Sequence, residues 1–248
     1  MTRPPVNDIP APPFPRPATW INVAGLRIDQ QRGRPVLVDF WDFCRPNSIR
    51  TLPYLRAWDE RYRDDGLRVI GVHSPGFAPS ADAEAVKAAV ARLEVQYAVI
   101  VDSDLAVWRE YDNLGWPARY LFDDRGMLSD YHFGEGGYAE TEAAIQSLLG
   151  VSRPLVEPVR AEDAEGAALV VQSDDVPGPY SGPYEAGEVW AVLEGSGSVS
   201  ADGVSIEVDH PGAYRLLRHE VSTAGSLSLE IGEGVTCHAT CFAPGLAS

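Results

Sequence analysis

The fold of this chain of 248 residues is decided by the stretch Val38-Asp39-Phe40-Trp41-Asp42-Phe43-Cys44-Arg45-Pro46-Asn47-Ser48. Its first half closes an almost continuous apolar run, residues 35–42, which follows Gly33 and is typical of a central strand buried on both faces. Its second half is a short loop that leads into a predicted helix. One cysteine, Cys44, therefore lies between the end of a buried strand and the start of a helix.

That helix is predicted over 47–64, because apolar side chains recur there at spacings of three and four residues. Asn47 or Ser48 can cap its first turn, and Gly66 ends it. The elements that follow are strands over 67–73, 97–101 and 118–123, helices over 81–93, 104–112 and 138–149, and an antiparallel return strand over 127–133. The order β-α-β-α-β-α-β-β-α predicts an α/β fold with a mixed sheet and helices on both faces.

The character of the sequence changes after this helical part, because glycine and valine become frequent and no helical period is present. Turn signals separate seven short candidate strands over 167–172, 187–193, 197–200, 203–208, 212–217, 226–231 and 235–242. Short strands at this spacing predict a small all-β sandwich or jelly roll. We therefore expect four parts: a proline-rich N-terminal arm (1–19), an α/β domain (20–152), a linker (153–166) and an all-β domain (167–248).

Composition argues against several classes of partner. The formal net charge of −16 argues against nucleic acid and against anionic membrane surfaces. No apolar run approaches the ~18–20 residues that span a bilayer, and Met1–Pro17 lacks the apolar core of a signal peptide. An odd count of three cysteines fits a reducing compartment. We expect a cytoplasmic protein, or an extracytoplasmic one if a leader was removed, and leave its oligomeric state open.

The loop around Cys44 is where chemistry is expected, since ligands collect where strands of an open α/β sheet end. A helix N-terminus and the neighbouring Arg45 favour the thiolate of Cys44, whereas Asp42 opposes it. If buried under the loop, Asp39 would have a raised pKa and could serve as a proton acceptor. Pro117, between Trp116 and a strand, occupies a position that usually holds a cis proline facing the thiol.

These residues resemble the thioredoxin-like superfamily over 20–150, and more narrowly the TlpA-like group and the extracytoplasmic thioredoxin-like domain of the DipZ proteins. The resemblance is carried by Val38-Asp39-Phe40-Trp41, Ile49-Arg50-Thr51-Leu52-Pro53-Tyr54, Val69-Ile70-Gly71-Val72-His73-Ser74-Pro75, Trp116-Pro117-Ala118 and His132-Phe133-Gly134-Glu135-Gly136. The C-terminal part resembles the carbohydrate-binding-module-like domain that follows thioredoxin in DipZ proteins, through Tyr180-Ser181-Gly182 and Val189-Trp190-Ala191-Val192-Leu193-Glu194-Gly195.

The sequence departs from that family at its Cys-x-x-Cys motif. Counting from Trp41 and Pro53 places Arg45 and Ser48 where the two cysteines of the family belong, so that Cys44 stands one position before the first of them. A slip of one residue would instead make Cys44-Arg45-Pro46-Asn47 the degenerate motif. In either alignment the loop cannot form its own disulfide, and the family's dithiol exchange is not carried over intact.

Two functions are compatible with this loop. The first is a monothiol oxidoreductase in which Cys44 attacks a disulfide or peroxide, with Arg45, Ser48 and Asp39 as catalytic partners. Its substrate would lie against Trp41, Phe43, Trp116 and Pro117, and an external thiol reductant, Cys237 or Cys241 would resolve the product. The alternative is a redox-inactive binding module, with the β-domain binding a peptide, a small molecule or a glycan. Neither function calls for a cofactor.

The C-terminal motif Cys237-His238-Ala239-Thr240-Cys241 invites a metal or disulfide interpretation. Residues four apart on a strand are ~13 Å apart, beyond the ~7 Å between Cα atoms that a disulfide allows. Strand alternation places both cysteines on one face, with Val235 and Ala239, and buried core is the better interpretation. His210, His219 and His238 lack a His-x-His cluster, so we predict no metal site.

Overall fold

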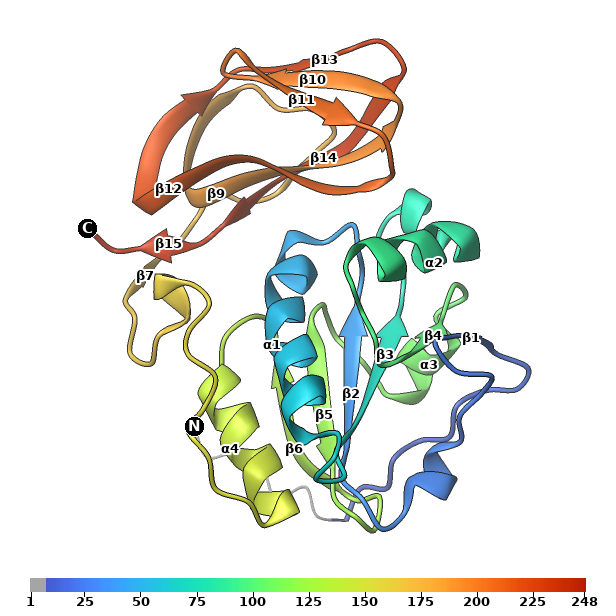
Figure 1. Ribbon diagram of the computed structural model, residues 1–248. Helices are drawn as coiled ribbons and strands as arrows, with labels where there is room; N and C mark the ends of the chain where they lie inside the picture. The colour runs from blue at the N-terminus through green and yellow to red at the C-terminus, as the bar shows by residue number, and fades with distance from the viewer. Residues whose placement is uncertain (1–7) are drawn as a thin grey trace. The chain divides into compact units, whose positions relative to one another are not determined.

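The computed structural model describes residues 8–248, and its backbone forms two compact units (Figure 1). The first unit holds the residues up to Asp42, Arg50–Pro75 and Ala81–Glu157. The second holds Phe43–Ile49, Gly76–Ser80 and Pro158–Ser248. Residues 1–7 of the predicted N-terminal arm lie outside the described residues. In the described part of the chain, no helix combines the length and apolar character needed to cross a membrane.

A six-stranded mixed sheet forms the centre of the first unit, and β2 lies inside it as the sequence predicts. Strands β2, β3 and β4 are parallel, whereas β1, β5 and β6 join antiparallel. Their spatial order is β1 (Thr19–Ile21), β4 (Ala98–Val101), β3 (Arg68–His73), β2 (Val36–Trp41), β5 (Ala118–Phe122) and β6 (Leu128–Phe133). The sequence predicted five of these strands; β1 pairs with β4 at the sheet edge and was not anticipated.

Alternation along β2 divides the first unit into two layers. Val36, Val38 and Phe40 join a core cluster that includes Val107 of α3 (Ala106–Glu110). The intervening residues of β2 face the opposite side. There Arg119, the β5 partner of Asp39, lies over the rings of Trp58 and Tyr138. These rings belong to α1 (Pro46–Tyr62) and α4 (Tyr138–Leu149), so helices cover both faces of the sheet.

Local sequence signals explain the ends of two helices. In α2 (Ala83–Arg92), the side chain of Asp82 accepts a hydrogen bond of 2.8 Å from the amide of Ala85, which caps the helix. A 3₁₀ turn, Ala78–Ala81, precedes that cap. Helix α4 ends at Gly150, whose φ of 66° is the left-handed conformation that favours glycine.

The described part of the N-terminal arm packs on the first unit. The amide of Leu128 donates to the carbonyl of Ile9 at 2.8 Å, and the amide of Ala11 donates to Gly126 at 2.9 Å. Phe14 is buried in the same core cluster as β2, with its ring 5.5 Å from that of Trp20. From Ile9 onward the arm therefore contributes to the core of this unit.

The second unit is built from antiparallel strands, as predicted for the C-terminal part. Residues from both of its larger sheets join one apolar core, for example Val189 on β9, Val199 on β10 and Phe242 on β14. The four-stranded sheet has the order β12 (Gly212–Leu227), β9 (Gly182–Gly195), β14 (Val235–Ala243) and β8 (Val176–Pro177). The three-stranded sheet has the order β11 (Val204–Val208), β10 (Gly197–Ala201) and β13 (Leu229–Ile231). A two-stranded sheet pairs β15 (Gly245–Leu246) with β7 (Leu169–Val170). The predicted strands 187–193 and 212–217 are parts of the longer β9 and β12, and 226–231 is divided between β12 and β13.

Candidate functional site

The loop that carries Cys44 joins the end of β2 to the start of α1. Helix α1 begins at Pro46, one residue before the predicted start, and proline is favoured at the first helical position. The amide of Ile49 donates to the carbonyl of Arg45 at 3.1 Å, which closes the first turn. Cys44 therefore lies two residues before the helix, where the helix dipole favours a thiolate, although its side chain is fully buried.

The cation expected beside Cys44 lies over an aromatic ring. The guanidinium carbon of Arg45 is 5.0 Å from the centroid of the Phe77 ring. Its side chain also contacts Gly76, where an added Cβ would lie only 2.6 Å from Arg45 Nε. The side chain of Arg45 is thus confined. Ser48, at the predicted position of the second cysteine, is buried in the first turn of α1.

Asp39 is buried in the middle of β2, on the face covered by α1 and α4. Burial raises the pKa of its carboxyl to about 8, and the charge of Arg119 opposes that rise. No group among residues 8–248 makes a hydrogen bond to Asp39 Oδ1. The carboxyl is therefore mostly protonated at neutral pH and can release or take up a proton in the physiological range.

Arg119 is a member of this site that the sequence analysis missed. It is fully buried next to Asp39 in the register of β5 with β2, and it donates a hydrogen bond to the carbonyl of Gly136. Its guanidinium lies over the ring of Tyr138 at 5.0 Å. The available signal was one cation inside the apolar strand Ala118-Arg119-Tyr120-Leu121-Phe122.

Two of the predicted substrate-contacting residues lie at the same end of neighbouring strands. Trp41 ends β2, and Pro117 directly precedes Ala118, the residue of β5 that pairs with Phe40. The peptide bond between Trp116 and Pro117 is cis. The indole of Trp116 donates to the carbonyl of Ser74 at 2.8 Å. The register thus places Trp41 and Pro117 at the same end of the two neighbouring strands. Phe43, the fourth of the predicted substrate-contacting residues, is buried in the loop after β2.

His73 borders this end of the strands as a neutral group. Its ring makes an edge contact with Trp41, at 4.9 Å between centroids, and its Nε2 lies 3.7 Å from Asp42 Oδ1. Burial lowers the pKa of His73 to about 3, so the imidazole carries no charge at neutral pH. The contact with Asp42 is therefore not an ion pair under those conditions.

The prediction that Cys237 and Cys241 share one face of their strand is wrong. A β-bulge lies between Cys237 and Ala239, and the extra residue reverses the alternation beyond it. Cys237 pairs with Leu193 and packs against the core of the second unit. Cys241 pairs with Trp190 and points to the other face, because its neighbour Phe242 points into that core.

The thiols of Cys237 and Cys241 are poorly placed for ionisation. None of the three cysteines is in a disulfide within the described residues. Burial raises the pKa of both Cys237 and Cys241. For Cys241 the nearby Asp175 raises the pKa further, while the positive charge of Arg45 lowers it. The charge of Arg45 affects the pKa of Cys241 but is not among the causes that shift the pKa of Cys237.

The three histidines of the second unit each have a separate partner. His219 contacts the hydroxyl of Tyr184 at 2.9 Å, and His238 contacts Glu194 at 3.0 Å. His210 contacts the carbonyl of Pro211. Over residues 8–248, no group of three His, Cys, Asp or Glu side chains is arranged to hold a metal ion.

Comparison with known proteins finds likenesses over both parts of the chain. Residues 10–131 match the AhpC/TSA family. Protein DipZ of Mycobacterium tuberculosis is 32% identical over 195 residues, which cover 77% of this chain and 27% of DipZ. An alignment of that extent reaches beyond residue 157 into the second unit. The chain spans about a quarter of the length of DipZ.

Two further likenesses cover most of the proteins compared. The thiol-disulfide oxidoreductase YkuV of Bacillus subtilis is 26% identical over 140 residues, which cover 56% of this chain and 94% of YkuV. The solution structure of a thioredoxin-like protein in the oxidized form superposes with a TM-score of 0.52 at 27% identity, over 57% of this chain and 95% of that protein. Together with the strand order and register of the mixed sheet, these likenesses show that the first unit is a thioredoxin-like domain.

Proposed function

We propose that this chain is a thioredoxin-fold oxidoreductase in which Cys44 works as the only thiol of the loop. The observation that carries the proposal is Asp39, a buried carboxyl with a pKa of about 8, which stands two residues before the end of the strand that leads to Cys44. A group that titrates near neutral pH can exchange a proton with a thiol in either direction. The likeness to a thiol-disulfide oxidoreductase supports the same class of reaction.

The proposed reaction begins with transfer of the Cys44 proton to ionised Asp39. The Cys44 thiolate then attacks one sulfur of a disulfide, a Cys44–substrate disulfide forms, the substrate S–S bond breaks and the second sulfur leaves as thiolate. Protonated Asp39 returns its proton to that leaving group. With a peroxide, the thiolate instead takes one oxygen to become a sulfenic acid, and the other oxygen leaves as water or an alcohol once protonated.

A second thiol completes the cycle. An external thiolate attacks the substrate-side sulfur of the mixed disulfide, so that Cys44 leaves as thiolate and the external thiol ends in a disulfide with the substrate half. Attack on the Cys44 sulfur instead releases the substrate half as thiolate, and a second thiol must then reduce the new disulfide of Cys44. Among the chain's own thiols we favour Cys241 over Cys237 for this attack, because the charge of Arg45, the neighbour of Cys44, reaches Cys241 and the side chain of Cys237 points into an apolar core. The pKa of Cys241 is nevertheless raised by its burial. Arg45 would stabilise the Cys44 thiolate, and Ser48 would occupy the position of the missing resolving cysteine without its chemistry.

The burial of Cys44 determines how the proposal is tested. A buried thiol reacts only after the loop opens, which lowers the reaction rate equally at every pH. The midpoint of the rate against pH, by contrast, still reports the pKa of the thiol. The midpoint is therefore the quantity to compare.

The experiment follows alkylation of Cys44 by iodoacetamide against pH, with a double Cys237→Ser, Cys241→Ser variant so that one thiol is observed. The proposal expects a midpoint near or below about 7, and a changed profile when Asp39 is replaced by asparagine. A midpoint at or above about 8.5, the value of an unperturbed cysteine, with no effect of Asp39→Asn, would contradict a redox role. The chain would then be a binding module.

A further inference from the structure

Several buried polar atoms in the first unit have no hydrogen-bond partner among the described residues, and three of them lie close to one another. These three are Oδ1 of Asp39, Nε1 of Trp41 and the hydroxyl of Tyr97. Buried polar groups in folded proteins are nearly always hydrogen-bonded, to protein or to ordered water. The three atoms therefore call for a shared explanation.

All three residues surround one glycine. Gly71 on β3 pairs with Asp39 on β2. A Cβ at Gly71 would lie 2.9 Å from Trp41 Nε1 and 3.1 Å from Cε2 of Tyr97. The indole and the phenol thus approach the backbone where a larger residue would exclude them. The carboxyl, the indole N–H and the phenol stand on the side of the sheet that α1 covers.

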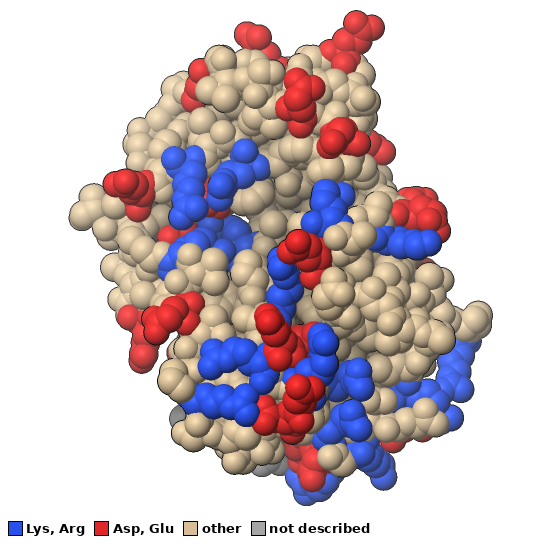
Figure 2. All heavy atoms as spheres, viewed as in Figure 1, with Lys and Arg blue, Asp and Glu red and all other residues tan. Residues whose placement is uncertain are grey.

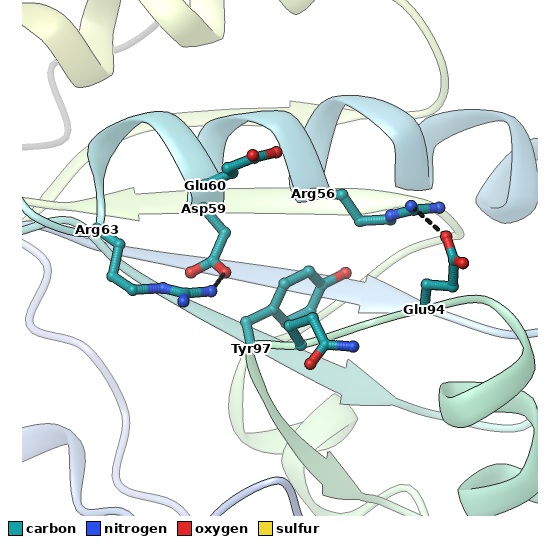
Figure 3. A pocket seen from close by; sticks show the side chains of 7 residues that line it. Arg56, Asp59, Glu60, Arg63, Glu94 and Tyr97 are labelled. Carbon is teal, nitrogen blue, oxygen red and sulfur yellow. Dashed lines mark hydrogen bonds and ion pairs between the residues drawn. The ribbon is translucent and has the colours of Figure 1, made fainter.

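A pocket of about 400 Å³ opens on the other side of Tyr97, between α1 and the segment that precedes β4. Figure 3 shows the Tyr97 ring below α1, between two ion pairs that line the pocket. One joins Arg56 to Glu94 at 2.6 Å, and the other joins Arg63 to Asp59. Figure 2 shows such basic and acidic side chains interleaved over α1.

Tyr97 responds to charges on both of its sides. Burial raises the pKa of its phenol, and so do the charges of Asp39 on the inner side and Asp59 on the pocket side, while Arg56 lowers it. The ring of Tyr97 borders Gly71, the strand partner of Asp39, and also lines the pocket, so Tyr97 stands between the two. Its side chain is only 4% exposed, so it closes the floor of the pocket.

We propose that this pocket is the solvent entrance to Asp39, and that the Tyr97 hydroxyl positions buried water which carries the carboxyl proton in and out. A buried water typically makes about three hydrogen bonds, and the carboxyl, the indole N–H and the phenol offer three. This inference rests on the proposed role of Asp39 in proton transfer, and it adds a route that is separate from the Cys44 loop.

The proton balance along this route is simple. Asp39 releases its proton to the bridging water, which donates one of its own protons to the Tyr97 oxygen as the hydroxyl proton passes outward to water in the pocket. Tyr97 and the bridging water end unchanged, and one proton reaches solvent. The path consists of Asp39 and Tyr97. The charged groups that act on it are Arg119 on β5 and Asp59 and Arg56 on α1.

The route is tested with the full chain and Tyr97→Phe, which keeps the ring and removes the hydroxyl. Nuclear magnetic resonance of ¹³Cγ-labelled aspartate gives both the titration midpoint of Asp39 and its rate of proton exchange. We expect exchange to slow by about tenfold, the scale of one lost hydrogen bond, and the midpoint to rise because the carboxylate loses a stabilising contact. Unchanged exchange and midpoint would overturn the proposal.

Tyr111→Phe is the matched control. Tyr111 is a buried phenol in the core on the other side of the sheet, where its hydroxyl donates to the carbonyl of Pro12. This variant should exchange the Asp39 proton as the unaltered chain does; equal slowing in both variants would contradict a specific route through Tyr97. Because Asp39 is observed directly, the result is informative whether or not Cys44 reacts.

A high-resolution crystal structure of the unaltered chain tests the same route without substitution. It should contain an ordered water within hydrogen-bond distance of both Asp39 Oδ1 and the Tyr97 hydroxyl. Well-ordered side chains with no water between them would refute the route even if Tyr97→Phe failed to fold.

Discussion

Replacement of Asp39 by asparagine should stabilise the chain, and the gain should grow as the pH rises. The folded-state pKa of Asp39 is about 8, against 3.8 in the reference state. Between these values the folded protein holds a proton that the unfolded chain has lost, so the free energy of unfolding falls as pH rises. The stabilisation of the folded state by the proton on Asp39 is fully present below the lower pKa and is lost above the higher one.

The size of this effect follows from the two pKa values. Each unit of difference corresponds to about 1.4 kcal/mol, so the unaltered chain loses up to about 4 kcal/mol by pH 7 and up to about 6 kcal/mol above pH 8. Asparagine has nearly the same shape and does not titrate, so Asp39→Asn removes the loss. The variant should therefore gain least near pH 4 and most near pH 8.

Urea unfolding at several pH values measures the difference, with the transition of the first unit followed by tryptophan fluorescence. Asp124→Asn, in the exposed turn before β6, is the matched control for the change from carboxyl to amide. A gain for Asp39→Asn that is the same at every pH would refute the reasoning. It would mean that Asp39 is ionised in the folded state.

Three further predictions concern the scaffold around the site. Gly71→Ala should lower the free energy of unfolding by about 1–3 kcal/mol and shift the fluorescence of Trp41, because the new Cβ lies 2.9 Å from Trp41 Nε1; an unchanged emission spectrum would contradict the contact. Phe40→Ala should lower the free energy of unfolding in urea by about 3–5 kcal/mol, since the centroid of its buried ring lies 5.3 Å from that of Tyr111 and 5.7 Å from that of Tyr120. A loss no larger than that caused by substituting an exposed residue would show that these rings are not tightly packed. Asp82→Ala should cost about 1 kcal/mol through the lost cap of α2, whereas Asp82→Ser should retain most of the stability and thereby identify the cap as the cause.

Sequence patterns predicted the first unit well because its elements have strong periodic signals. The central strand was expected over 35–42 and is Val36–Trp41, and the closing helix was expected and found over 138–149. The edge strand Thr19–Ile21 has only three residues and none of them is fully buried, so it leaves little pattern. In the second unit, bulges near Arg215 and Thr223 break the alternation of β12, which hid its full length.

The candidate site was only partly within reach of the sequence. Asp39 could be singled out, because a carboxylate in a buried apolar run is unusual and costly. Arg119 also stands out, as one cation in an apolar strand, but its place beside Asp39 depends on which strands lie next to β2. Tyr97 offers no such signal, since its part in the site depends on the packing of α1. One bulge puts Cys241 on the face opposite to that of Cys237, a feature that alternation alone does not reveal.

The most direct test of the central claim is mass spectrometry of the full chain after incubation with a small disulfide such as oxidised glutathione, with Cys44→Ser as control. The account predicts a mixed disulfide on Cys44, or a Cys44–Cys241 bridge formed from it, and neither product in the variant. If Cys44 stays unmodified while Cys237 or Cys241 reacts, or if the variant is modified to the same extent, the loop thiol is not the redox group of this protein.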